Sequence, residues 1–296
     1  MTLSTPRSAA PPQTQASDAG SASGAKSRRI SSRPSTPPAS GLRGGLRTFR
    51  WQLVAVLAVL LIWQLAAATS DGSLPGPLQV AAALAGLWGT GAYWTAVLTT
   101  LKVWALGLAI CTVIGIPLGL LIGISINATR STRWVIDFFR TIPTIALLPL
   151  VLLLFGPSIR MEITLIVLSA VWPLMIQSMY AVKQVEPVLK WVTKVFRVSR
   201  RDRIRFLWAP SVTLLVTTGM RLAATIALLM TVSAEYIGGA AGLGKQLSIS
   251  EQAFQRPEVI AYALTAGIIG LGVNMLILFV QRRLLWWHPI TRGERA

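Results

Sequence analysis

The residues of this chain that could carry chemistry are few. Cys111 is the only cysteine and His288 the only histidine, which leaves too few groups for an internal disulfide, a Cys-rich or His-rich metal site, or a His-based triad. Three charges, Lys102, Arg221 and Glu235, fall in apolar runs, with no nucleophile–base pair or paired carboxylates among them. A charge in such a run must face a partner or water. Lys102 and Arg221 could attract an anion, and an ion pair or carbonyl contact explains Arg221 equally well.

The longest polar stretch between the apolar runs is strongly basic. The basic segment, Lys183–Pro210, carries eight Lys or Arg residues against two acids, Glu186 and Asp202. A segment this basic is rarely translocated, which favours the cytoplasmic side of a membrane. It is also long for a plain connector. We therefore expect it to dock a soluble partner, and the alternative is a solvated basic stripe on lipid headgroups.

The composition predicts a polytopic membrane protein. Of the 296 residues, 53% are hydrophobic and only 13% are charged, about half the charged share of a typical soluble domain. The net charge of +18 would indicate nucleic-acid binding in a soluble protein. Here the basic residues gather in tails and loops, where they act as topology signals.

Hydropathy and composition divide the chain into three parts. We expect a disordered basic tail over residues 1–50, a membrane domain over 51–285 and a cytoplasmic tail over 286–296. The fold class is therefore an all-α integral membrane protein with about six transmembrane helices. The predicted spans are 51–68, 95–124, 144–155, 162–182, 211–236 and 259–280, with residues 125–143 returning to the cytoplasm.

The distribution of Lys and Arg predicts the orientation. With both termini inside, nearly all of the 28 basic residues fall in cytoplasmic segments; the exceptions are Lys102, Arg160, Arg221, Lys245 and Arg256. This bias favours an N-in, C-in arrangement.

Glycine and proline mark places where the spans depart from plain helices. Gly115, Gly119 and Gly123 follow at four-residue steps and favour close helix packing. The short third span contains Pro149 and is typical of helices that line a cavity. The glycine-rich loop with Gly242 and Gly244 follows a membrane helix, so it is not a phosphate cradle.

The basic segment resembles a known signature. Permease subunits of bacterial binding-protein-dependent ABC importers carry a cytoplasmic loop of the form E-A-A-x3-G-x9-I-x-L-P. In this chain Trp191, Val192 and Thr193 stand at E-A-A, Arg197 stands at the glycine and Pro210 matches the proline. The spacing is kept, whereas the glutamate and the glycine are absent. Because glycine permits a tight turn that arginine resists, the docking geometry is the part of the resemblance that this departure affects.

Flanking motifs resemble the aliphatic sulfonate, taurine and nitrate branch of these permeases. They are the R-T-I-P-T-I-A-L-L-P run from Arg140 to Pro149, G-M-R-L-A from Gly219, and A-E at Glu235 followed by G-L-G at Gly242. The resemblance covers about residues 51–285.

The resemblance implies the fold of a type I ABC importer permease and its partners. These are cytoplasmic ABC ATPase subunits, an extracytoplasmic substrate-binding protein and a second permease, identical or different, in a bacterial inner membrane, with no cofactor and no nucleic acid. It places ATPase docking on Trp191, Thr193, Arg197, Ser199, Arg200, Arg201, Asp202 and Pro210. The candidate pathway or gate residues are Lys102, Pro149, Arg221, Glu235, Gly242 and Gly244. The competing function is a gradient-driven transporter or channel, which gives no role to the basic segment; a membrane enzyme lacks the necessary groups.

Overall fold

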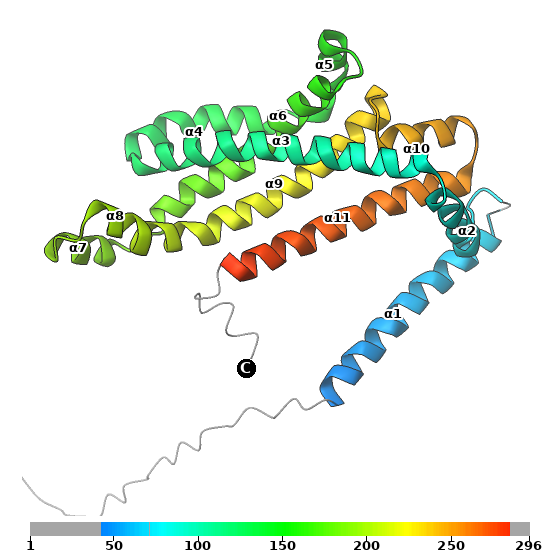
Figure 1. Cartoon of the computed structure of the whole chain (residues 1–296), viewed down its shortest axis with the longest axis horizontal. Helices are drawn as coiled ribbons and strands as arrows, with labels where there is room; N and C mark the ends of the chain where they lie inside the picture. Colours follow the sequence, from blue (N-terminus) through cyan, green and yellow to red (C-terminus); the bar gives the residue numbers. More distant parts are fainter. Residues whose placement is uncertain (1–42, 71, 285–296) are drawn as a thin grey trace, which may run out of the picture. The chain divides into compact units, whose positions relative to one another are not determined.

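The computed structural model describes residues 43–70 and 72–284, which form helices joined by short connections and contain no strand (Figure 1). In chain order the elements are α1 (Arg43–Ala68), α2 (Pro77–Trp88), α3 (Gly91–Ile124), α4 (Ile126–Thr141), the 3-10 turn η1 (Thr144–Leu147), α5 (Leu148–Phe155), α6 (Ile159–Lys183), α7 (Pro187–Val195), α8 (Arg200–Arg203), the π-helical turn η2 (Ile204–Trp208), α9 (Ala209–Gly238), α10 (Leu243–Gln252) and α11 (Arg256–Leu284).

The chain divides into two compact units after Leu53. Of the first unit, the structure describes the opening turns of α1, so this helix begins before the predicted boundary at Trp51. The second unit contains the rest of α1 and the other helices. Residues 1–42 of the predicted tail over 1–50, and the predicted C-terminal tail over 286–296 with His288, lie outside the described residues.

Five helical stretches are long and apolar enough to cross a membrane, and a sixth crossing is present if α4 and η1–α5 form one bent span. The two halves of that pair meet at an angle of 69°. The prediction of about six helical spans is therefore confirmed. The N-in, C-in orientation stays a prediction.

Residues 126–141 form helix α4, whereas the sequence predicted a cytoplasmic loop over residues 125–143. Ser125 alone separates α3 from α4, and its hydroxyl oxygen accepts a hydrogen bond from the Ala128 N–H at 3.3 Å, which caps α4. The basic residues of α4 lowered its apparent hydropathy. Asp137 offsets part of their charge, because it lies 3.7 Å from Arg133 and 3.1 Å from Arg140.

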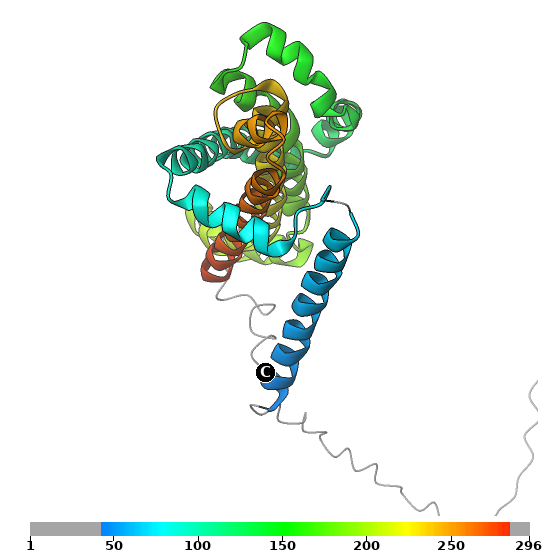
Figure 2. The same ribbon diagram turned by 90° about the vertical axis from the view of Figure 1, so that its right-hand side faces the viewer.

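The core lies where α6 packs against both α3 and α9. Figure 1 shows the three helices running alongside one another, and Figure 2 shows them nearly end-on. Glycines bring the helix backbones together, as their spacing predicted. A Cβ at Gly123 of α3 would lie 2.7 Å from the Met179 carbonyl oxygen of α6, and one at Gly219 of α9 would lie 2.8 Å from Cβ of Gln177. Backbones this close leave no room for a larger residue.

Candidate functional site

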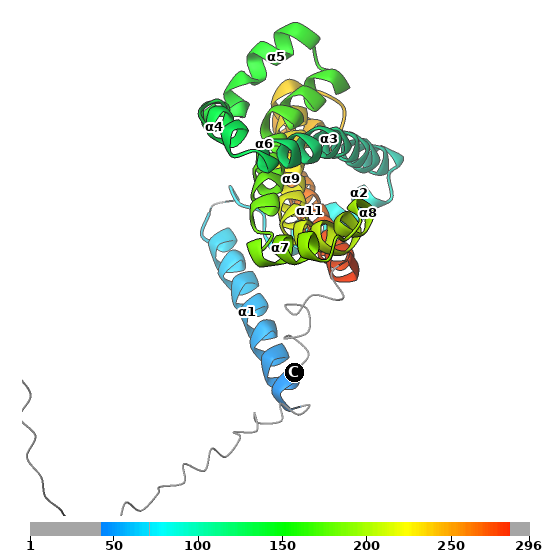
Figure 3. The same cartoon turned by 90° about the vertical axis from the view of Figure 1, so that its left-hand side faces the viewer.

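The basic segment folds into α7, α8 and η2 at the end of the unit that faces the viewer in Figure 3. Its helix α7 carries an apolar surface that no described residue covers. Val188, Trp191 and Val195 are 67%, 68% and 74% exposed. Arg200 and Arg201 add two exposed cations at the start of α8. Uncovered apolar surface beside positive charge is typical of a surface that binds a partner.

The turn between α7 and α8 contains Arg197 in the left-handed conformation, with φ of 49°. The Arg197 N–H donates to the Lys194 carbonyl at 3.1 Å, and the Val198 N–H donates to the Thr193 carbonyl at 3.0 Å. This pair of bonds is the Schellman helix ending, which usually has glycine at the left-handed position. Arg197 therefore adopts the turn that the missing glycine would permit, at a cost of about 1 kcal/mol.

Helix α8 is capped by its own side chains. The Ser199 hydroxyl accepts from the Asp202 N–H at 3.2 Å and donates to the Asp202 carboxylate at 2.7 Å. This arrangement resembles a capping box and fixes the direction in which Arg200 and Arg201 leave the turn.

Pro210 does not end the helix that contains it. Helical structure runs without a break from Arg200 through η2 into α9, and the Ala209 N–H bonds to the Ile204 carbonyl five residues earlier. Because proline has no N–H to donate, the π turn that precedes it absorbs the change in hydrogen-bond register. The basic segment is thus joined to α9 by continuous helix.

At the other end of α9, the structure brings Glu235, Gly242 and Gly244 together. Glu235 is fully buried, and its Oε2 accepts from the Gly244 N–H at 2.9 Å and from the Thr100 hydroxyl at 3.0 Å. The Thr100 hydroxyl oxygen also accepts from the Leu243 N–H at 2.9 Å. A carboxylate and a hydroxyl therefore satisfy the free N–H groups that begin α10.

Both glycines are required by this close approach. A Cβ at Gly242 would collide with the Glu235 carboxyl group, and one at Gly244 would lie 2.6 Å from the Tyr236 backbone nitrogen. The glycine-rich loop is therefore clamped onto the end of α9.

Two members of this cluster were missed from the sequence. From the sequence, Thr100 was assigned no role, and Glu162 entered only as the start of the predicted span 162–182. Glu162 is 1% exposed, its Oε2 has no hydrogen-bond partner among the described residues, and its carboxyl group interacts electrostatically with that of Glu235. An acid in an otherwise apolar run was the signal that could have identified it.

The other candidate pathway residues do not join this cluster. Lys102 and Arg221 are exposed on α3 and α9, and no ion pair to either occurs among residues 43–70 and 72–284. Pro149 is exposed in the first turn of α5. In that same part of the chain, no group of three His, Cys, Asp or Glu side chains could hold a metal ion.

Comparison with known proteins decides the family. A model of the family described as "Binding-protein-dependent transport system inner membrane component" matches residues 115–285, more than half of the chain. The chain belongs to this family of permeases. The predictions of family, helical fold class and multi-pass membrane location are therefore confirmed, and the permease is a transport subunit rather than an enzyme.

Relatives of the permease come from several transport systems. It is 28% identical to the nitrate import permease protein NrtB of Leptolyngbya laminosa, over 66% of this chain and 70% of that protein. It is 26% identical to the bicarbonate transport system permease protein CmpB of Synechococcus elongatus, over 88% and 97% of the two chains. It is 27% identical to the taurine transport system permease protein TauC of Escherichia coli, over 81% and 93%.

Proposed function

We propose that the permease forms the membrane pathway of an ABC importer for a small anion and that ATP hydrolysis in a separate subunit drives it through the basic segment. The shape of the basic segment is the observation that supports coupling to ATP hydrolysis. Three features lie at the start of the helical run that includes α9: an exposed apolar helix, a left-handed turn at Arg197 and the exposed pair Arg200–Arg201. Because continuous helix joins this surface to the core helix α9, a movement imposed there would be transmitted to the membrane domain.

The substrate class rests on the relatives, whose names specify nitrate, bicarbonate and taurine. Each of these solutes carries a small oxygen-rich anionic group. A substrate-binding protein outside the membrane and a second permease complete the proposed importer.

Affinity purification from membranes in mild detergent tests the coupling. We expect an ABC ATPase to co-purify with the wild-type permease and to be lost, by about 10-fold or more, when Arg200→Glu and Arg201→Glu are combined, because the reversed charges would repel an acidic groove. The matched control is Arg160→Glu with Lys245→Glu, which reverses the same number of exposed charges outside the basic segment. Folded wild-type protein that brings no ATPase would instead support the gradient-driven transporter.

A further inference from the structure

A cavity with both apolar and polar walls opens beside the bend between α4 and η1–α5. Its volume is about 420 Å³, and α4, η1, α6 and α9 line it. The residues that matter for its chemistry are Arg140, Thr144, Ser169, Trp172 and Gln177. We propose that this cavity binds the transported anion within the membrane and that Arg140 holds its charge. The proposal rests on the proposed function, because it assigns a site to that importer's substrate.

The depth of the cavity is the first argument. Trp172 is next to the midpoint of α6, and Ile226 is close to the midpoint of α9; both line the cavity. Arg140 lies roughly 21 Å along α4 from its first residue, at 1.5 Å per residue. In the six-span arrangement this distance places Arg140 within the hydrocarbon core, which is about 30 Å thick, and a charge there requires a partner or a water-filled space.

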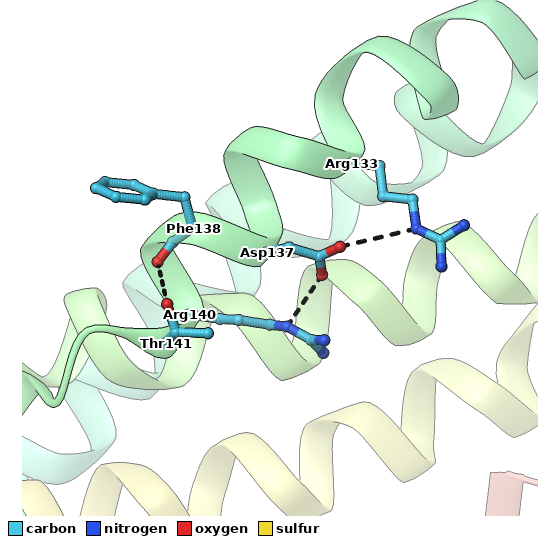
Figure 4. A network of polar contacts seen from close by, with 5 residues as sticks. All are labelled: Arg133, Asp137, Phe138, Arg140 and Thr141. Carbon is cyan, nitrogen blue, oxygen red and sulfur yellow. Dashed lines mark hydrogen bonds and ion pairs between the residues drawn. The ribbon is translucent and has the colours of Figure 1, made fainter.

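The ion pair that Arg140 forms leaves part of its guanidinium unpaired. Its Nε lies 3.1 Å from the Asp137 carboxylate, which also pairs with Arg133 at 3.7 Å, so two cations share one acid. Figure 4 shows the far end of the Arg140 guanidinium extending away from Asp137. The terminal nitrogens Nη1 and Nη2 take no part in that ion pair. A planar guanidinium with free terminal donors matches a small oxyanion in both charge and geometry.

Further donors stand on other walls of the cavity. The Gln177 carboxamide and the Thr144 hydroxyl make no hydrogen bond with any described residue. Ser169 and Trp172 are different, because their hydrogens already bond to backbone carbonyls of α6. The cavity thus offers uncommitted donors from α4, η1 and α6, as a pocket for an acceptor-rich solute requires.

Aromatic packing holds the cationic wall in place. The rings of Phe139 and Trp172 stack with centroids 5.8 Å apart and planes 7° apart, which fixes the end of α4 against α6. Because Phe139 precedes Arg140 directly, this contact holds the helix turn that carries Arg140 beside the cavity. The Arg140 side chain itself is 53% exposed, so its guanidinium is accessible to a solute that enters the cavity.

Thiol labelling of the full-length permease in membrane vesicles, within its importer complex, tests the site. A Thr144→Cys variant places a thiol in the cavity, and the native Cys111 is fully buried, which keeps the background low. The probes are a sulfonate-bearing and a trimethylammonium-bearing methanethiosulfonate of similar size. We expect the anionic reagent to react faster, with the anionic-to-cationic rate ratio falling about 10-fold on adding Arg140→Gln.

The matched control is Arg133→Gln, which removes a charge from the same helix and the same acid but does not line this cavity. Its rate ratio should change less than about 2-fold, since Arg133 does not line the cavity and its more exposed charge is screened by solvent. If Arg140→Gln fails to fold, Gln177→Leu replaces it and should weaken the protection of Thr144→Cys by nitrate, bicarbonate or taurine. An unchanged ratio in Arg140→Gln, or a thiol that neither reagent reaches, would overturn the proposal.

Uptake of the same three solutes distinguishes a failure of the cavity assignment from a failure of the proposed function. If the wild type imports one of them and the ATPase co-purifies, but Arg140→Gln imports it as well as Arg133→Gln does, then the cavity assignment alone fails. If the wild type imports none of them and no ATPase co-purifies, the proposed function fails instead. The supporting result is uptake reduced about 10-fold or more in Arg140→Gln with the ATPase still bound.

Discussion

Arg197 shows how one residue can depart from a family pattern while the backbone keeps its path. The sequence resemblance places glycine at this position, and the structure retains the left-handed turn with arginine. The side chain therefore pays a conformational cost that glycine would avoid. What is gained is a further cation on the surface proposed to dock the ATPase.

Replacement of Arg197 by glycine should stabilise the end of α7. Removing the left-handed cost of about 1 kcal/mol should slow hydrogen exchange of the Val198 amide by roughly 5-fold. The control is Val195→Gly, in the last turn of α7, which should speed exchange because glycine is a poorer helix former than valine. Faster exchange in Arg197→Gly would contradict the assigned turn.

Among the elements, the contact between α3 and α6 depends on residues without side chains. At Gly119 a Cβ would collide with the Met175 carbonyl oxygen, which is backbone and cannot rotate away. Gly272 on α11 has no atom within 4 Å of the corresponding position. The same substitution should therefore destabilise the protein at Gly119 and be tolerated at Gly272.

Gly119→Leu should force α3 and α6 apart, and Gly272→Leu should be tolerated. We expect the first variant to lose several kcal/mol, since overpacking commonly costs 1–3 kcal/mol even for smaller insertions. The thermal unfolding midpoint of each variant in detergent measures the effect. Equal midpoints for Gly119→Leu and the wild type would show that the helices do not approach as described.

Element by element, the apolar spans and the glycine-mediated packing could be predicted from the sequence, because hydropathy and four-residue spacing are local signals. Helix α4 could not, because its arginines made it look like a loop and the acid that pairs with them, Asp137, counts as a further charge in a hydropathy sum. The buried contact of Glu235 with Thr100 joins residues 135 positions apart, and no local pattern contains that information.

For the whole molecule, the open question of topology concerns the bent third crossing. If α4 and η1–α5 cross together, then Ser125 and Pro157 face opposite sides of the membrane, whereas a re-entrant hairpin would return both to one side. The count of crossings in turn sets whether the two termini share a compartment.

Cysteine labelling with a membrane-impermeant maleimide should distinguish these arrangements. We expect Pro157→Cys to react in intact cells and Ser125→Cys to react only after the membrane is opened, in line with the positive-inside bias. The unmodified chain is the control, because its one cysteine is buried. Reaction of both variants from the same side would replace the six-span arrangement with five spans and a re-entrant loop.

The unbroken helix from Arg200 to Gly238 also gives the protein mechanical leverage. At 1.5 Å per residue α9 is about 45 Å long, so a tilt of about 10° at its start would displace its far end by roughly 8 Å. That far end carries Glu235 and, through it, the first turn of α10. The π turn at Ile204–Trp208 is the one irregular step in this run. A movement applied at Arg200 and Arg201 would therefore produce a larger displacement at the glycine-rich loop. The stiffness of η2 would determine how much of that movement is lost.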